Sequence, residues 1–119
     1  MTAIYTDLKD KRVFITGGGT GIGASIVEHF CEQKAEVYFI DINEKASNEL
    51  VLKCKNKEIS IPNFIKCDLL DIKKLQNVLL KIIEENGPIE ILFVNAHKVI
   101  MIDIRKMIFT FLLFSIWKI

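Results

Sequence analysis

The sequence has almost no net charge, which narrows its range of partners. Sixteen lysines and arginines offset fifteen aspartates and glutamates, so the formal charge is +1. Because neither sign dominates, the composition gives no electrostatic reason to expect nucleic acid or an acidic membrane surface as a partner. The chain has 119 residues, half of them hydrophobic, which suffices for one small domain with one core.

Cysteine is scarce and irregularly spaced. Cys31, Cys54 and Cys67 are odd in number and form no C-x-x-C pair, which argues against a disulfide framework and against a zinc site. Each lies in or beside an apolar segment, so we expect buried reduced thiols and no bound metal. Residues 1–12 lack a basic stretch leading into an apolar one, the pattern of a secretory signal. These absences predict a cytoplasmic protein.

The chain also lacks an apolar run long enough to span a membrane. The most apolar part, residues 98–119, contains no glycine, proline, alanine or asparagine. Asp103, Arg105 and Lys106 interrupt it and leave about eleven uninterrupted residues, against the roughly twenty that cross a bilayer. We therefore expect no membrane span, and we treat residues 98–119 as an atypical apolar tail that is not an independent domain.

Glycine is rare except in one place. Five of the six glycines lie in TGGGTGIG, from Thr16 to Gly23, between an apolar strand pattern and a helical pattern. Backbone N–H groups and the helix dipole attract anions to such a helix start, and glycines let a pyrophosphate approach the backbone. On this interpretation Gly17 makes the turn, Gly21 permits close approach and Gly23 lets the helix pack on the sheet. Glycines are also ordinary turn residues, so the context decides.

Strand patterns recur along the chain. Residues 12–17, 36–41 and 89–95 are predicted strands, and the last is a nearly continuous apolar run of the kind buried on both faces of a sheet. A further strand falls within residues 59–67, where Pro62 moves its regular part toward Phe64, Ile65 and Lys66. A helix follows the glycines, because Ile22, Ile26, Val27, Phe30 and Cys31 recur at helical spacing as an apolar stripe.

Residues that begin and end helices separate these strands. Asn43 and Asp71 are suitable N-caps for the second and third helices, and Gly87 with Pro88 ends the third. Strands that alternate with helices specify right-handed crossovers. The predicted fold class is therefore α/β, a three-layer parallel sheet with helices on both faces and the strand order 3-2-1-4.

A carboxylate completes the glycine pattern. Asp41 ends the second predicted strand about two dozen positions after Gly17, near the spacing at which an acidic residue accepts hydrogen bonds from the ribose of a dinucleotide. Asp41 would repel the extra phosphate of NADP, and Gly18, Gly19 and Thr20 bring no cation, so NAD is favoured over NADP. Lys45 argues the other way. The alternative for Asp41 is a solvated aspartate at the start of a helix.

Together these motifs resemble the short-chain dehydrogenase/reductase family. The resemblance runs from Lys11 to about Ala96 and rests on TGGGTGIG, FIDIN, KCDLLD and GPIEILFVNA. It implies a Rossmann-type fold that binds NAD(P) and transfers hydride between the nicotinamide and an alcohol or ketone. The residues assigned to the cofactor are Thr16, Gly17, Gly18, Gly19, Thr20, Gly21, Ile22, Gly23, Asp41, Ile42, Asp68, Leu69, Asn95 and Ala96.

The resemblance also implies individual roles. Asp68 would lie beside the adenine amino group, the Leu69 backbone would line the adenine pocket, and Asn95 with Ala96 would approach the cofactor ribose. The alternatives are a loop residue for Asp68 and, for Asn95, a strand-end residue that satisfies local backbone groups.

The chain departs from the family pattern toward its end. In the family a glycine usually follows Asn-Asn-Ala, and His97 stands at that position in this chain. A histidine there would alter the nicotinamide side of the pocket, where a glycine lets the cofactor approach the backbone. The sequence offers no catalytic partner for His97. The family's catalytic serine and Tyr-x-x-x-Lys pair are absent from the expected strand and helix. Tyr5–Lys9 spells that pair before the first strand, which we treat as coincidence, and Ser115 lies in the apolar tail. We therefore predict no catalytic residues in this chain.

Two functional hypotheses follow. The first is a truncated or frameshifted reductase, with a partial NAD(P)-binding Rossmann domain in residues 1–97, inactive alone. The second is a non-catalytic module that binds NAD or another adenine nucleotide and associates with a partner through its tail. Self-association through the edge of the fourth strand and the tail fits either hypothesis. A structural protein that binds no nucleotide would leave TGGGTGIG and Asp41 unexplained.

Overall fold

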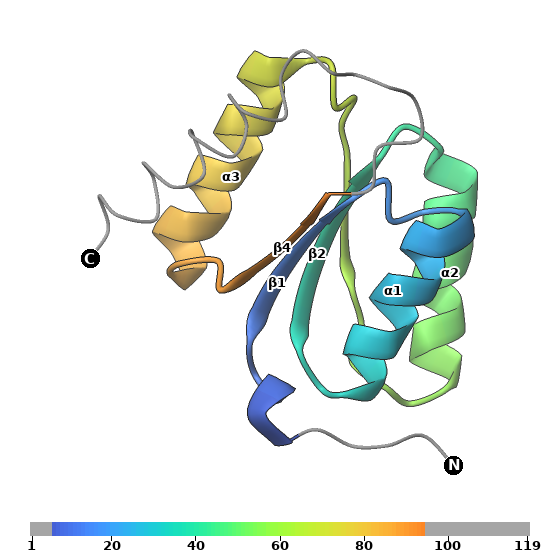
Figure 1. The fold of residues 1–119 in the computed structure, drawn as a ribbon. Helices are drawn as coiled ribbons and strands as arrows, with labels where there is room; N and C mark the ends of the chain where they lie inside the picture. The colour runs from blue at the N-terminus through green and yellow to red at the C-terminus, as the bar shows by residue number, and fades with distance from the viewer. Residues whose placement is uncertain (1–5, 95–119) are drawn as a thin grey trace.

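Four parallel strands form one sheet in the order β3-β2-β1-β4 in the computed structural model, which describes residues 6–94 (Figure 1). All three strand pairings are parallel. The elements are a 3-10 helix at Thr6–Leu8, β1 at Arg12–Thr16, α1 at Gly21–Glu32, β2 at Glu36–Asp41, α2 at Glu44–Asn56, β3 at Asn63–Lys66, α3 at Ile72–Asn86 and β4 at Ile91–Val94. The predicted α/β class and strand order are confirmed.

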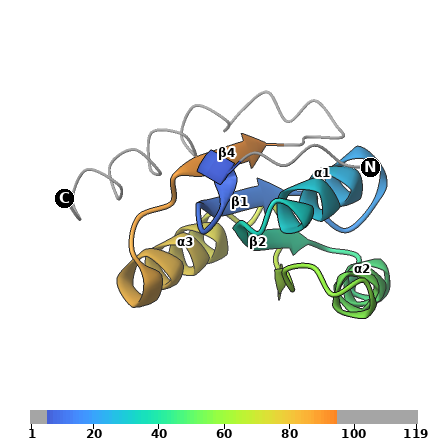
Figure 2. The same cartoon turned by 90° about the horizontal axis from the view of Figure 1, so that it is seen from below.

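Helices cover both faces of the sheet. Figure 2 shows α3 on one side of the strands and α1 with α2 on the other. Successive strand residues point to opposite faces, so β1 supplies Phe14 to the core beside α3 and Ile15 to the core beside α1 and α2. Leu79 joins the first core, while Val27 and Cys54 join the second. This arrangement confirms the predicted three layers.

The helices begin and end at the predicted residues. Asn43 Oδ1 accepts a hydrogen bond from the Ala46 N–H at 3.0 Å, and Asp71 Oδ1 accepts one from the Lys74 N–H at 3.1 Å. Both side chains therefore cap the first turn of a helix, which leaves fewer amides without a partner. α3 ends at Gly87, whose φ of +102° is a conformation that favours glycine.

Two residues of the apolar patterns, one in α1 and one in β4, are exposed. Val27 and Cys31 of α1 are buried, but Ile22 is 70% exposed because it lies in the first turn of the helix, at the edge of the sheet. Phe93 of β4 is 36% exposed. Within residues 6–94, β4 pairs only with β1 and is an edge strand, and its other residues are half-buried, with Ile91 against the core beside α1 and α2 and Leu92 and Val94 against the core beside α3.

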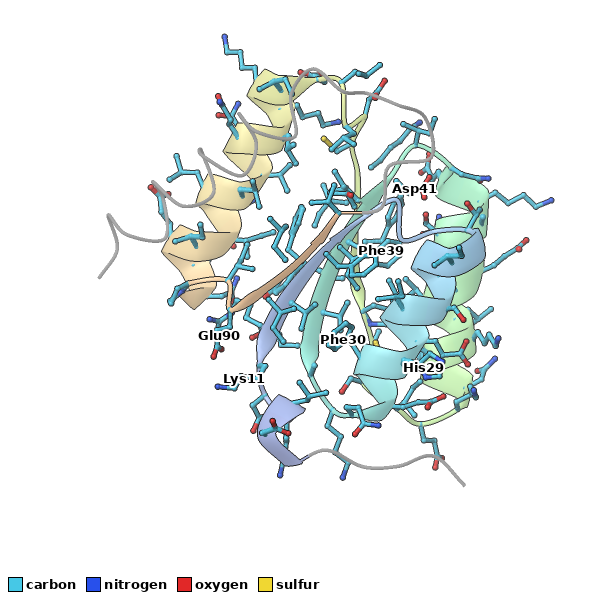
Figure 3. The ribbon with its side chains drawn as sticks, in the orientation of Figure 1. Lys11, His29, Phe30, Phe39, Asp41 and Glu90 are labelled. Atoms are coloured by element: carbon cyan, nitrogen blue, oxygen red, sulfur yellow. The ribbon has the colours of Figure 1, made fainter. Side chains whose placement is uncertain are left out.

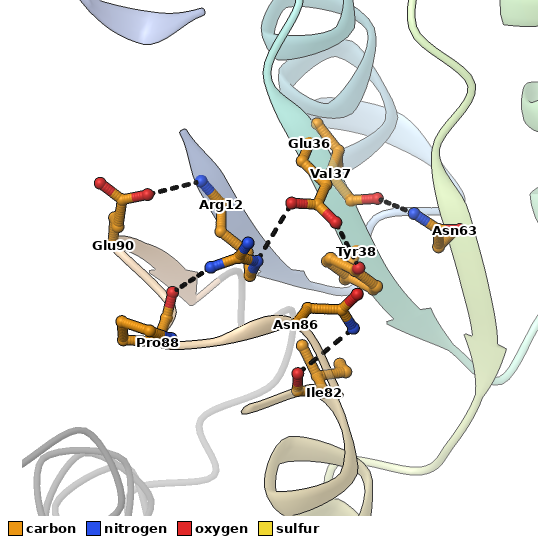
Figure 4. Close-up of polar contacts among 9 residues, drawn as sticks. All are labelled: Arg12, Glu36, Val37, Tyr38, Asn63, Ile82, Asn86, Pro88 and Glu90. Carbon is orange, nitrogen blue, oxygen red and sulfur yellow. Dashed lines mark hydrogen bonds and ion pairs between the residues drawn. The ribbon is translucent and has the colours of Figure 1, made fainter. Parts of the chain in front are cut away.

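Polar contacts hold the edge of the sheet where the strands begin, which we call the amino edge (Figure 4). Arg12 Nε donates to Glu36 Oε2 at 3.0 Å, and Arg12 Nη1 donates to the Pro88 carbonyl oxygen at 2.9 Å. The Glu90 carboxylate accepts from the Arg12 N–H at 3.3 Å and from Lys11 Nζ at 3.0 Å. These contacts tie β1 to β2 and to the segment that leads into β4.

Tyr38 belongs to the core and to the amino edge at once. Its ring packs in the core beside α3, and its hydroxyl donates to Glu36 Oε1 at 2.6 Å (Figure 4). Burial, together with the carboxylate of Glu36, raises the pKa of Tyr38 to about 12. The hydroxyl therefore stays protonated at neutral pH and acts here as a structural donor.

The cysteines are buried and free, as predicted. Within residues 6–94, no helix has both the length and the apolar character that a membrane span requires. The predicted tail, His97, Ser115 and the tyrosine of the Tyr5–Lys9 match lie outside the described residues.

Candidate functional site

The predicted site residues gather where the parallel strands end, which we call the carboxyl edge. Thr16 ends β1, Asp41 ends β2, and Asp68 follows β3 by two residues. Thr16 is in register with Val94 at the end of β4. The Cys67 N–H donates to the Asp41 carbonyl oxygen at 3.3 Å, which joins the segment after β3 to the end of β2. Residues far apart in the sequence thus meet at one edge.

The turn at residues 17–19, which we call the glycine turn, is bonded to β2. The N–H groups of Gly17 and Gly18 both donate to the Ile40 carbonyl oxygen, at 2.9 and 3.2 Å. Gly17 has a φ of +64° and Gly21 a φ of +58°, which side chains rarely tolerate. The positive φ therefore explains glycine at both positions by backbone conformation. This reason adds to the turn predicted for Gly17 and the close approach of a ligand predicted for Gly21. Gly23 is buried within α1.

Gly18 and Gly19 have little space beside them because side chains from β2 and α2 occupy it. A Cβ on Gly18 would lie 2.7 Å from Phe39 Cβ. A Cβ on Gly19 would meet Ser47 Oγ and lie 3.0 Å from the Asp41 carboxylate. Figure 3 shows Phe39 and Asp41 at the end of β2 beside this turn. The chain's own packing excludes side chains at these two glycines.

Sequence reasoning missed Phe39 and Ser47 as supports of the glycine turn. Phe39 was predicted only as part of the strand at residues 36–41, and Ser47 is a small polar residue in a helix. Both are fully buried, with exposed fractions of 0%. Their contact with the turn is tertiary, and the only available signal was a small residue one turn into the helix that follows Asp41.

The Asp41 carboxylate holds two backbone amides. Oδ2 accepts from the Gly19 N–H at 2.9 Å, and Oδ1 accepts from the Asn43 N–H at 2.8 Å. A carboxylate has about four positions for hydrogen bonds, so each oxygen keeps one for a ligand hydroxyl. The side chain is half-buried, and Ile42 beside it is exposed. Asp41 is therefore bonded to the glycine turn as well as to the start of α2.

The start of α1 lacks the side-chain cap found on α2 and α3. The N-cap residue Thr20 makes no side-chain cap hydrogen bond, and the first turn contains no acidic residue. Thr20, Gly21 and Ile22 are exposed. The first amides of a helix have no acceptor within the helix, and the dipole makes that end positive. This helix start can therefore accept an anion.

Asp68 and Leu69 lie in the turn after β3. Asp68 Oδ1 accepts from the Leu70 N–H at 2.9 Å, and its carbonyl oxygen accepts from the Asp71 N–H at 2.9 Å. Asp68 is exposed, and Leu69 packs against the core beside α3. Burial raises the pKa of the Cys67 thiol just before them, so this thiol is not an activated nucleophile.

Asn95 and Ala96, the last two residues assigned to the cofactor, lie outside residues 6–94, as does His97. The His29 side chain lies on the surface of α1 and is 70% exposed. In the described part of the chain, histidine, cysteine, aspartate and glutamate side chains form no group of three or more that could hold a metal ion.

The sequence of this chain is similar to proteins of one known family. The sequence model of the short chain dehydrogenase family matches residues 11–107. The chain is 40% identical over 95 residues to the D-xylose 1-dehydrogenase of Caulobacter vibrioides, an alignment that covers 80% of this chain and 36% of that protein. It is 36% identical over 94 residues to the probable galactose dehydrogenase GalD of Rhizobium meliloti, which covers 79% of this chain and 37% of that protein.

A solved structure agrees with these relatives. The 2-keto-3-deoxy-D-gluconate dehydrogenase from Streptococcus agalactiae superposes with a TM-score of 0.68 at 28% identity, over 83% of this chain and 37% of that chain. This chain spans about a third of the length of the curated relatives it matches. The family uses NAD or NADP as its cofactor. Since the family model matches most of the sequence, this chain belongs to the short-chain dehydrogenase/reductase family.

Proposed function

We propose that this chain is the dinucleotide-binding part of an oxidoreductase that transfers hydride between NAD and an alcohol or ketone. The observation that carries the proposal is the uncapped start of α1, which lies directly after the glycine turn. Its amides would hold the pyrophosphate, and the remaining lone pairs of Asp41 would accept from the ribose hydroxyls. Ile42, Asp68 and Leu69 would line the adenine, and the nicotinamide, when bound, would supply the hydride chemistry.

NAD is the proposed cofactor in preference to NADP. The extra phosphate of NADP would lie beside the Asp41 carboxylate, and like charges at that distance repel. Gly18, Gly19 and Thr20 offer no cation to offset this repulsion.

The test places a competing carboxylate at the helix start. Thr20→Asp would cap α1 and stabilise it, because a negative charge is favourable at that end. The same carboxylate would occupy the amides and repel a pyrophosphate, so we expect calorimetric titration to show NAD affinity reduced about tenfold or more.

Thr20→Ser is the matched control and should bind NAD like the parent chain. Thermal unfolding separates loss of binding from loss of folding, because Thr20→Asp should unfold at the same temperature or higher. NAD affinity that is unchanged in Thr20→Asp would contradict the proposal.

We further propose that these 119 residues bind the dinucleotide without turnover. Only two tyrosines are present, Tyr5 and Tyr38, and Tyr38 is buried with its hydroxyl bonded to Glu36. Dehydrogenase assays with NAD and a panel of alcohols and sugars test this, with NAD binding as the positive control. Measurable turnover would contradict it. Sugars belong in the panel because two relatives are named as D-xylose and galactose dehydrogenases.

A cytoplasmic location remains part of the proposal, supported by three buried free thiols. The alternative of a binding module that recruits a partner depends on residues 98–119, which the structure does not describe, and no observation on residues 6–94 favours it. The boundary between the domain and the tail, and self-association at β4, also remain predictions.

A further inference from the structure

We infer that Asp41 is a positioning residue for the glycine turn, with Ser47 as its support from α2, in addition to the ribose contact proposed above. The inference rests on the proposed function because it gives a second task to a residue of that site. On this inference, recognition of the ribose and the conformation of the glycine turn depend on the same carboxylate.

The hydrogen bonds of the turn single out Asp41. The N–H groups of Gly17 and Gly18 donate to the backbone oxygen of Ile40, and a side-chain substitution leaves that oxygen in place. The Gly19 N–H instead donates to a side chain, Asp41 Oδ2, at 2.9 Å. Gly19 is buried, so removal of this acceptor leaves a buried amide without its partner.

Ser47 packs against the turn beside the Asp41 carboxylate. Its hydroxyl donates to the Asn43 carbonyl oxygen at 2.7 Å, which holds Oγ at the position that a Cβ of Gly19 would need. The Asn43 N–H in turn donates to Asp41 Oδ1 at 2.8 Å. A continuous path of contacts therefore runs from Asp41 through Asn43 and Ser47 to Gly19.

This geometry has a consequence for cofactor choice. Replacing Asp41 by alanine removes the charge that repels the phosphate of NADP, and it also releases Gly19. Asp41→Asn removes the same charge but keeps an oxygen that can accept from the Gly19 N–H. A change of preference toward NADP therefore requires an acceptor at position 41, and neutralising the charge is not sufficient.

Inorganic pyrophosphate is the decisive probe because it has no ribose. If Asp41 only contacts ribose, loss of its negative charge in either variant leaves pyrophosphate binding unchanged or stronger. If Asp41 positions the turn, Asp41→Ala weakens pyrophosphate binding about tenfold, whereas Asp41→Asn binds it at least as tightly as the parent chain. Titration followed by NMR shifts of the loop amides measures both affinities.

Hydrogen exchange of the Gly19 amide in the ligand-free chain gives a readout that does not depend on the cofactor. We expect Asp41→Ala to exchange about tenfold faster at this amide and Asp41→Asn to stay close to the parent chain. Ser47→Ala should also speed exchange, whereas Asn48→Ala, an exposed neighbour, should not. Equal protection of Gly19 in Asp41→Ala and the parent chain would overturn the inference. If the parent chain bound no NAD, the proposed function would fail while this exchange experiment still decided the inference.

Discussion

Three adjacent glycines, residues 17 to 19, meet different physical demands. Gly17 needs a positive φ, Gly18 avoids the Phe39 side chain, and Gly19 avoids Ser47 and the Asp41 carboxylate. Backbone conformation therefore explains glycine at position 17. At positions 18 and 19 the explanation is lack of space, because neighbouring side chains of the protein occupy the position of a Cβ.

Gly18→Ala tests the demand for space. The added Cβ would lie 2.7 to 2.9 Å from three atoms of the Phe39 side chain, and one of these is Cβ, which cannot move away by rotation of the ring. We expect the free energy of unfolding to fall by about 1 to 3 kcal/mol, the usual range for an overpacked core. Urea unfolding followed by circular dichroism measures it.

Ser25→Ala, on an exposed position of α1, is the control and should change the stability by less than about 0.5 kcal/mol. Equal stability of Gly18→Ala and the parent chain would show that the turn moves away from β2 at no cost.

At this scale the sequence predicted some site residues and not others. Asp41 followed from its spacing to Gly17, and that spacing comes from the length of one strand-helix-strand unit. Ser47 and Phe39 did not follow, because their contacts with the glycines depend on how α2 packs beside the turn. Ile22 is exposed although it continues the apolar stripe of α1, because periodicity does not show where a helix passes the edge of its sheet.

At the scale of elements, α1 and α2 are joined by ion pairs as well as by apolar packing. The Glu28 side chain of α1, only 15% exposed, accepts from Lys57 and from Lys53, the latter at 3.1 Å. Lys57 also lies 3.7 Å from the Glu32 carboxylate. The hydrogen bond from Lys57, followed by that from Lys53, lowers the pKa of Glu28 below its ordinary value of 4.5.

The lowered pKa predicts an acid-sensitive contact between the two helices. A carboxyl whose pKa is lower in the folded state stabilises that state above its unfolded pKa, and the contribution disappears as the pH falls through the folded value. We expect the free energy of unfolding to decline below about pH 4.5 less steeply in Glu28→Gln than in the parent chain. Urea titrations over a range of acidic pH measure the two slopes.

Glu49→Gln provides the control, since Glu49 is an exposed glutamate of α2. It should leave the acid dependence of the parent chain unchanged. Identical slopes for Glu28→Gln and the parent chain would contradict a lowered pKa of Glu28 in the folded state.

The sequence predicted the caps of two helices better than the start of one strand. The caps Asn43 and Asp71 were found because capping is local chemistry within one turn. The regular part of the third strand was predicted at Phe64, Ile65 and Lys66, one residue short of Asn63–Lys66, because Pro62 removes a donor without fixing where pairing with β2 begins. Strand pairing depends on the partner strand, which a local pattern does not contain.

At the scale of the whole molecule, the cysteines report on the integrity of both cores. Cys31 and Cys54 lie in the core beside α1 and α2, and Cys67 lies in the core beside α3. Burial is the largest cause of the raised pKa of each thiol. The thiolate is the reactive form, so folding protects all three.

We expect a thiol reagent to modify the folded chain slowly and the urea-unfolded chain rapidly, with all three cysteines modified at similar rates in the folded state. Global opening would then control each reaction. Mass spectrometry of the labelled cysteines over time measures the rates. Fast labelling of Cys67 alone would instead show that the α3 face opens by itself.

The contacts at the amino edge determine when β4 can join the sheet during folding. β1 is synthesised first, yet β4 can pair with it only once residues 91–94 have been made. The bond between Arg12 and Glu90 spans 78 positions of sequence, and contacts of such separation form late because a long loop must close first. The β4 side of β1 thus stays unpaired until residues 91–94 have been made, and the arrival of Glu90 beside Lys11 and Arg12 completes the four-stranded sheet of residues 6–94.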